Sequence, residues 1–159
     1  MKELILLRHA KSSWSYNTED RNRPLSEKGI ERIIDISKKD HDIFKDPDHI
    51  FSSPANRALH TASIMIHKSN ISFNRLSIDE DLYNFNFEKI TNYVYNLDDN
   101  FSKVILVGHN PAFTMAANNL GNLSLNNIPT ACWVRIFFIE SSWTEVNKVK
   151  KVEKSERIQ

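Results

Sequence analysis

The sequence predicts an α/β protein, a three-layer sandwich in which helices cover both faces of a mainly parallel sheet with antiparallel edge strands. Two short runs contain only apolar residues, as in strands buried on both faces: Leu4–Leu7 and Val104–Val107. Segments with the apolar spacing of amphipathic helices alternate with the predicted strands. Two further segments, Cys132–Ile139 and Trp143–Val149, are typical of a hairpin and would supply the antiparallel edge.

The first predicted strand is followed by a polar segment of about 15 residues, from Lys11 to Leu25. A loop of that length is usually either functional or disordered. Ser26 then has the side chain of a helix N-cap, and apolar residues recur at helical spacing as far as about Lys39. This part of the chain therefore predicts a long loop and then a helix.

A short strand at Ile50–Ser52 precedes a second helix start. Ser53 is predicted as its N-cap, and Pro54 suits the first helical turn, where a backbone N–H would have no partner. Small and apolar residues between Ala58 and Ile66 share one face of this helix.

The middle of the chain continues the same alternation. Ile71–Ile78 alternates apolar and polar residues and predicts a strand, and Phe87–Leu97 has helical spacing. After the buried run at 104–107, Asn110 and Pro111 repeat the combination of cap and proline. Gly121 is expected to end the helix that follows.

The length and composition indicate one globular domain. The 159 residues, 40% hydrophobic and 26% charged, are enough to build a packed core. We predict a single domain over residues 1–150 and a charged tail over residues 151–159 that frays from Lys150.

Several functional classes are disfavoured by the same composition. A net charge of +1 indicates neither a nucleic acid nor a membrane as partner. A single cysteine, Cys132, excludes an internal disulfide framework. No apolar stretch approaches the roughly 20 residues of a membrane span, and the first apolar run is too short for a signal peptide. A cytoplasmic protein is therefore expected.

Chemically active side chains follow the predicted strands. His9 and His109 come directly after the two buried runs, where ligands bind in open α/β sheets. Arg8 precedes the first histidine, and Arg57 lies in the first turn of the helix after a third strand. Two arginines, two histidines and two helix N-termini at one edge would form a site for a doubly charged anion, most simply a phosphoryl group.

Each of these residues also has an ordinary explanation. A histidine after a strand is usually just a loop residue, Arg8 could form a surface salt bridge, and Arg57 could be an exposed helix residue. A metal site is another alternative, but the six histidines show no H-E-x-x-H spacing. The glycine-rich motifs of nucleotide-binding proteins are absent from the sequence.

Four stretches carry a resemblance to a known family. Residues 6–14, LLRHAKSSW, resemble the signature of the histidine phosphatase superfamily, in the form found in its SixA-like phosphohistidine phosphatase branch. RPLSEKG at 23–29, SSPANRA at 52–58 and VGHNP at 107–111 resemble that branch's motifs in the same order. The resemblance spans about residues 3–139 and implies a phosphoglycerate-mutase-like fold.

The resemblance also implies roles for individual residues. His9 would take the phosphoryl group on its imidazole, and Arg8, Arg57 and His109 would bind the phosphoryl oxygens. Arg23 falls on an arginine that lines the pocket in relatives. No metal or other cofactor is expected.

Two further assignments follow from the resemblance. Ser15 stands where mutase-like relatives place an asparagine on the phosphate. Members that cleave phosphate esters use a carboxylic acid to protonate the leaving oxygen, and Glu80 is the nearest match by order along the chain, with Asp81 and Glu88 as other candidates.

The expected function is a phosphohydrolase that works through a phosphohistidine intermediate and removes phosphate from phosphohistidine on proteins. Neutral imidazole is a nucleophile, and a reference pKa of about 6.5 makes that form available near neutrality. Phosphate, sulfate or vanadate should bind in the pocket. The alternatives are a phosphatase or mutase of small phosphate esters, and a phosphate-recognition module without turnover.

Overall fold

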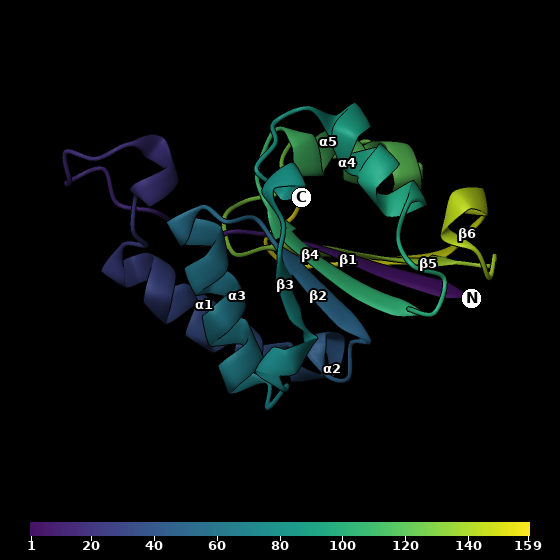
Figure 1. Cartoon of the computed structure of the whole chain (residues 1–159), viewed down its shortest axis with the longest axis horizontal. Helices are drawn as coiled ribbons and strands as arrows, with labels where there is room; N and C mark the ends of the chain where they lie inside the picture. Colours follow the sequence, from purple (N-terminus) through teal and green to yellow (C-terminus); the bar gives the residue numbers. More distant parts are fainter.

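A computed structural model describes all residues 1–159, and it confirms the predicted α/β class. Six strands form one sheet in the order β3-β2-β4-β1-β5-β6 (Figure 1). The strands are β1 (Lys2–Arg8), β2 (His49–Ser52), β3 (Leu76–Ile78), β4 (Lys103–Gly108), β5 (Trp133–Phe138) and β6 (Val149–Lys154). The pairs among β1 to β4 are parallel, and β5 joins β1 and β6 through antiparallel pairs.

Helices cover both faces of this sheet, which gives the three layers (Figure 1). The α-helices are α1 (Glu27–Lys39), α2 (His41–Phe44), α3 (Asn56–Lys68), α4 (Phe87–Tyr95) and α5 (Ala112–Gly121). Short 3-10 turns lie at η1 (Asp20–Asn22), η2 (Phe73–Arg75), η3 (Glu80–Leu82) and η4 (Trp143–Glu145). The first three helices lie on one face, and α4 and α5 lie on the other.

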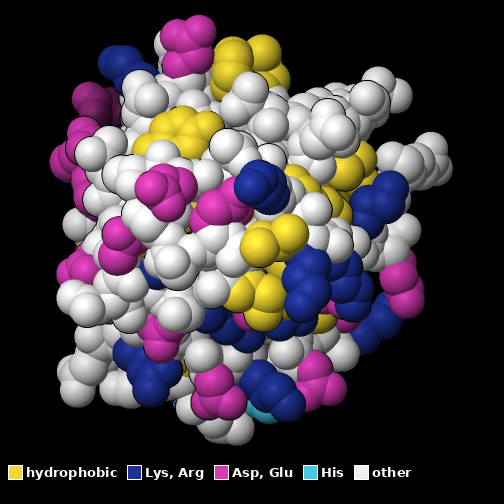
Figure 2. Space-filling view, turned by 90° about the vertical axis from the view of Figure 1, so that its right-hand side faces the viewer, with side chains coloured by type: hydrophobic (Ala, Val, Ile, Leu, Met, Phe, Trp, Pro, Cys, Tyr) yellow, Lys and Arg dark blue, Asp and Glu magenta, His cyan; other side chains and the backbone are white.

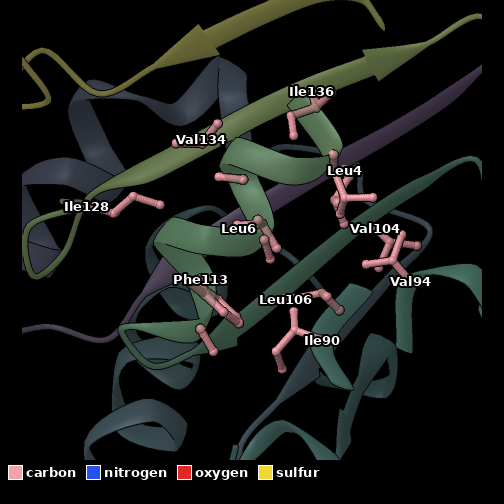
Figure 3. Packing of buried hydrophobic residues seen from close by; sticks show 14 of the residues in the cluster. Leu4, Leu6, Ile90, Val94, Val104, Leu106, Phe113, Ile128, Val134 and Ile136 are labelled. Atoms are coloured by element: carbon pink, nitrogen blue, oxygen red, sulfur yellow. The ribbon is translucent and has the colours of Figure 1, made fainter. Parts of the chain in front are cut away.

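The continuous apolar run of β1 is explained by these two layers. Successive side chains of a strand point to opposite faces. Leu4 and Leu6 belong to the core under α4 and α5, where Leu6 lies near Phe113 and Leu4 lies near Val104 (Figure 3). Ile5 and Leu7 belong to the second core, against the other helices. All four leucine and isoleucine side chains are fully buried, so the middle of this strand is shielded from water on both faces.

The two predicted serine caps behave differently. Ser26 caps α1 as predicted, because its side chain accepts a hydrogen bond from the backbone N–H of Gly29 at 3.0 Å. Ser53 was predicted to cap α3, and this is wrong. The helix begins at Asn56, and the Ser53 hydroxyl instead contacts His109 Nε2 at 2.7 Å and the N–H of Ala55 at 3.2 Å.

One strand prediction needs correction, and one predicted helix end is confirmed. Of the predicted strand Ile71–Ile78, only the last three residues pair with β2, because the preceding residues form the turn η2. The helix α5 ends at Gly121 as predicted, and the residue after it, Asn122, adopts the left-handed conformation with φ of 51° that commonly follows a helix end.

The predicted strand at Trp143–Val149 and the frayed tail from Lys150 are both wrong. Trp143 is buried, and its indole N–H donates to the carbonyl of Phe101 at 2.8 Å, which holds the segment in a 3-10 turn. The last strand is therefore β6, which begins at Val149, continues into the predicted tail and pairs with β5. Beyond it Ser155 and Ile158 are buried as well, so packing orders the charged end of the chain.

The sheet brings three strand ends to one edge. Arg8 at the end of β1 is in register with Gly108 at the end of β4, and Ser52 at the end of β2 pairs with Val107. The opposite edge, where β1 begins, mixes positive and negative side chains with small hydrophobic groups (Figure 2). None of the helices is long and apolar enough to cross a membrane.

Candidate active site

The four residues that follow the strand ends lie together. Arg8, His9, Arg57 and His109 line one cavity of about 290 Å³ at the carboxyl edge of the sheet. The other lining residues are Ser12, Trp14, Asp20, Arg23, Phe85, Asn110 and Thr130. His109 and Arg57 are only 1% and 2% exposed, so the inner part of the cavity is formed by buried charged and titratable groups.

His9 is held in one protonation state and one orientation. Its Nδ1 lies 2.7 Å from the carbonyl oxygen of Ala10. A carbonyl can only accept a hydrogen bond, so Nδ1 carries the proton and Nε2 keeps a free lone pair. Burial, together with the charges of Arg57 and Arg8, lowers the pKa of His9 to about 4 even though the bond to Ala10 opposes the shift. The ring is therefore a neutral nucleophile at neutral pH.

His109 faces His9, with 5.2 Å between the ring centroids. Burial and the neighbouring His9 and Arg57 lower the pKa of His109 to about 3, so this ring is neutral as well. Its Nε2 contacts Ser53, whereas Nδ1 is buried without a partner. When the Ser53 hydroxyl donates to Nε2, Nδ1 carries a proton and becomes a free hydrogen-bond donor. His109 can then bind an oxyanion as a dipole rather than as a cation.

The guanidinium groups of Arg8 and Arg57 are each held by a backbone carbonyl, and each has one nitrogen without a hydrogen-bond partner. Arg8 Nη1 donates to the carbonyl of Ile128 at 2.8 Å, and Arg57 Nη1 donates to the carbonyl of Asp20 at 2.7 Å. The Nε of each arginine is buried and has no partner. Buried donors are nearly always satisfied in folded proteins. A ligand with several acceptor oxygens would satisfy both at once.

Comparison with known families decides the identity of this fold and site. Residues 4–103 match the histidine phosphatase superfamily (branch 1). The chain belongs to the histidine phosphatase superfamily. A comparison with curated protein sequences finds no match.

Solved structures of several phosphatases resemble the chain over most of its length. A protein assigned as the phosphohistidine phosphatase SixA of Agrobacterium tumefaciens is 25% identical, with a TM-score of 0.73 over 85% of this chain and 91% of that one. The protein histidine phosphatase SixA in complex with tungstate is 14% identical, with a TM-score of 0.79 over 94% and 95% of the two chains. A mycobacterial glucosyl-3-phosphoglycerate phosphatase with inorganic phosphate is 15% identical, with a TM-score of 0.67 over 96% of both.

Membership in the superfamily, together with these structures, supports phosphatase activity and a ligand of the phosphate type. The unpartnered donors of the cavity agree with such a ligand. With both histidines neutral, the three arginines and the one carboxylate of the cavity leave it a net charge of +2, which matches a phosphoryl dianion.

The further site residues expected from the sequence do not all reach the cavity. Arg23 does, with its guanidinium stacked on the ring of Trp14 at 3.6 Å and hydrogen-bonded to Ser12. Ser15 does not, because the loop turns away from the cavity after Trp14. Ser15 is exposed, and its backbone N–H donates to the hydroxyl of Ser13 at 3.2 Å.

Glu80 also lies outside the cavity, as part of the turn η3. Its side chain is 68% exposed, and both carboxylate oxygens accept from the guanidinium of Arg21. The hydrogen bond and charge of Arg21 lower the pKa of Glu80, which opposes a role as proton donor. The structure does not place Glu80 with the other expected site residues.

Six residues that line the cavity were not expected as site residues from the sequence: Ser12, Trp14, Asp20, Phe85, Asn110 and Thr130. Three of them make contacts with the expected site residues that the sequence did not reveal. Asp20 accepts hydrogen bonds from Arg23 and Arg57, and its spacing of three residues before an expected pocket arginine was the available signal. Trp14 lies within the recognised motif, but only the structure shows that it stacks on Arg23. Phe85 lies 5.5 Å from His109 between ring centroids, and no motif surrounds it.

Proposed function

We propose that this histidine phosphatase removes the phosphoryl group from phosphohistidine side chains of proteins, through a covalent intermediate on His9. One observation carries the proposal. A neutral imidazole, with Nδ1 hydrogen-bonded to a carbonyl and Nε2 free, lies in a cavity where Arg8 and Arg57 each have a buried Nε without a partner.

In the first step Nε2 of His9 attacks the phosphorus and forms a P–N bond. The P–N bond to the substrate imidazole breaks, and its electron pair goes to the leaving ring. The Nδ1 proton of His9 stays in place, and the carbonyl of Ala10 stabilises the positive charge that the ring acquires. Arg8, Arg57 and His109 would donate hydrogen bonds to the phosphoryl oxygens, where positioning and electrostatics supply most of the catalysis.

In the second step a water molecule attacks the phosphorus of phosphorylated His9. A P–O bond forms, the P–N bond breaks, and the electron pair returns to Nε2, which regenerates the neutral ring. One proton of the water is released to solvent or to the product, which is inorganic phosphate. Splitting the displacement into two steps is the general advantage of a covalent intermediate.

The acid–base groups favour a nitrogen leaving group over an alkoxide. Glu80 is bound to Arg21 outside the cavity, and the carboxyl within it, Asp20, has a pKa lowered to about 2. Burial alone would raise that pKa, but hydrogen bonds from Tyr83 and Arg57 outweigh burial. No carboxylic acid in the cavity is therefore protonated at neutral pH. A protonated phosphohistidine ring leaves as neutral imidazole and needs no such acid.

The outer part of the cavity suits a side chain presented by a protein. Trp14 is 78% exposed, and Phe85 is exposed as well, so the aromatic rim of the cavity is open to solvent. A phosphorylated side chain that projects from a partner surface could reach the buried groups. Phosphatases of small esters share this fold, as the glucosyl-3-phosphoglycerate phosphatase does, and such an ester is the second candidate substrate.

The test compares two substrates at equal concentration. Phosphate release is followed with a phosphohistidine-containing protein and with an alkyl phosphate, for the wild type and for His9→Ala as the inactive control. We expect release from the phosphohistidine protein by the wild type alone, and slow or no release from the alkyl phosphate. Faster turnover of the alkyl phosphate would overturn the proposed substrate, and full activity of His9→Ala would overturn the mechanism.

A further inference from the structure

The carboxylate of Asp20 connects two arginines of the cavity. Oδ1 accepts from Nε and Nη2 of Arg23 at 3.2 and 3.1 Å. Oδ2 accepts from Nη2 of Arg57 at 3.0 Å and from the hydroxyl of Tyr83. The backbone carbonyl of Asp20 adds a fifth contact, to Nη1 of Arg57 at 2.7 Å.

These contacts determine which guanidinium nitrogen of Arg57 remains available to bind a ligand. Both of its Nη atoms bind Asp20, once through the backbone and once through the side chain. Nε is the one guanidinium nitrogen left buried and without a partner. Asp20 therefore approaches the guanidinium from the edge opposite to Nε, and it fixes the plane in which Nε–H points.

The carboxylate itself has no capacity left for a substrate. A carboxylate has about four lone-pair sites, and four side-chain hydrogen bonds from Arg23, Arg57 and Tyr83 fill them. The same donors, against the opposing effect of burial, hold the pKa of Asp20 at about 2. Asp20 is thus ionised and saturated, so it can neither donate a proton nor accept one from a bound ring.

We propose that Asp20 is a positioning residue for phosphoryl transfer, which clamps Arg57 and Arg23 so that the free Nε–H of Arg57 is aimed at a phosphoryl oxygen. The proposal rests on the phosphoryl-transfer function given above, but not on the identity of the substrate. An arginine that is not held would have to be ordered during each reaction, and small misplacements of catalytic groups can lower rates by large factors.

The first experiment measures steady-state kinetics of Asp20→Asn and Asp20→Ala on whichever phosphorylated substrate the wild type turns over. We expect kcat to fall on the order of 10–100-fold in Asp20→Ala and less in Asp20→Asn, which keeps the size of the side chain. Glu19→Gln is the matched control, because it removes the neighbouring carboxylate, which is exposed and makes no side-chain hydrogen bond. Its kinetics should equal those of the wild type.

The second measurement separates positioning from general loss of structure. Vanadate resembles the five-coordinate transition state, whereas inorganic phosphate resembles the product. We expect Asp20→Ala to weaken inhibition by vanadate by about tenfold or more, since the aimed donor acts mainly in the transition state. Inhibition by phosphate should weaken by less than about threefold, because loss of a negative charge offsets part of the lost contact. Asp20→Glu, which restores the charge, should recover more kcat than Asp20→Asn.

Two experimental results would contradict the proposal. If kcat and vanadate inhibition are unchanged in both Asp20→Ala and Asp20→Asn, Asp20 has no role in positioning the arginines. Tighter binding of phosphate with kcat preserved would show that Asp20 competes with the ligand for the arginines instead of orienting them. Both experiments use whichever phosphorylated substrate the wild type turns over, so failure of the phosphohistidine substrate would leave this test intact.

Discussion

Arg57 shows what a sequence predicts at the scale of one residue and what it does not. Its place at a strand-to-helix junction, and the motif around it, indicated an anion-binding side chain. Nothing in the sequence indicated that both its Nη atoms bind Asp20 or that Nε remains unpartnered, because these contacts join α3 to the turn η1, 37 residues away. The sequence did not indicate the neutral state of His109 either, because burial in the folded protein is its main cause.

Replacing Arg57 by alanine should lower kcat on the order of 10²-fold or more, the scale for loss of one preorganised transition-state donor. Arg57→Lys keeps the charge but loses the planar fork that binds Asp20, so we expect it to recover only part of the loss. The measurement is phosphate release under saturating substrate, with Arg32→Ala on the exposed face of α1 as control. If Arg57→Ala has the kcat of the wild type, Arg57 does not stabilise the transition state.

Glu80→Gln should slow hydrolysis of a phosphohistidine protein by less than about tenfold, below the range typical of a general acid. The reason is its exposed position and its ion pair with Arg21 outside the cavity. Rates of the variant and the wild type are compared on the phosphohistidine protein and on an alkyl phosphate. A loss near 10³-fold on the phosphohistidine protein would identify Glu80 as a true acid and shift the substrate toward phosphate esters.

At the scale of secondary-structure elements, local signals predicted helices and buried strands well and long-range contacts poorly. Ser26 and Ser53 look alike in sequence, but only Ser26 caps a helix, since His109 engages the other hydroxyl. Trp143 suits a strand by propensity, yet its hydrogen bond to Phe101 holds it in a turn. The edge strand β6 was taken for a frayed tail because four of its six residues are charged, as an exposed edge strand permits.

Ser155, just after β6, provides a test of this ordered end. Its hydroxyl accepts a hydrogen bond from the buried N–H of Trp133 at 2.7 Å. Ser155→Ala would leave that donor unpaired, so we expect the free energy of unfolding to fall by about 1–3 kcal/mol. Urea denaturation measures the change, and the exposed Ser141→Ala serves as control. If Ser155→Ala and Ser141→Ala have the same free energy of unfolding, the end of the chain is not packed as described.

At the scale of the whole molecule, one edge of the sheet gathers the buried polar groups that the cores exclude. Both cores are apolar, whereas His9, Arg57 and His109 are buried together at the carboxyl edge. The sequence predicted that the sheet is mainly parallel and that the residues after its strands converge. The sequence did not predict how much these buried groups change the stability, because that depends on how deeply each ring is buried.

That arrangement makes stability depend on pH. The pKa of His9 is lowered to about 4 and that of His109 to about 3, whereas both are about 6.5 in an unfolded chain. Below pH 6.5 the unfolded chain therefore binds more protons. The stability contributed by each neutral ring is complete above that pH and is lost as the pH falls toward 4 for His9 and toward 3 for His109. Between pH 7 and pH 5 we expect a loss on the order of 1–2 kcal/mol per histidine.

Urea denaturation of the wild type and of His9→Gln at these two pH values measures the contribution of one ring. The variant has no ring to protonate at this position, so its free energy of unfolding should fall less between pH 7 and pH 5 than that of the wild type. An equal fall in both proteins would contradict the neutral, buried state of His9.

The central claim is that His9 carries the phosphoryl group during turnover, and trapping the intermediate tests it. The protein is mixed with a phosphohistidine-containing substrate, quenched with alkali within the first turnovers, and digested for mass spectrometry. We predict a phosphorylated peptide with the modification on His9 in the wild type, and neither modification nor turnover in His9→Ala. Steady turnover with no phosphorylated His9, or with the group on another residue, would contradict the account.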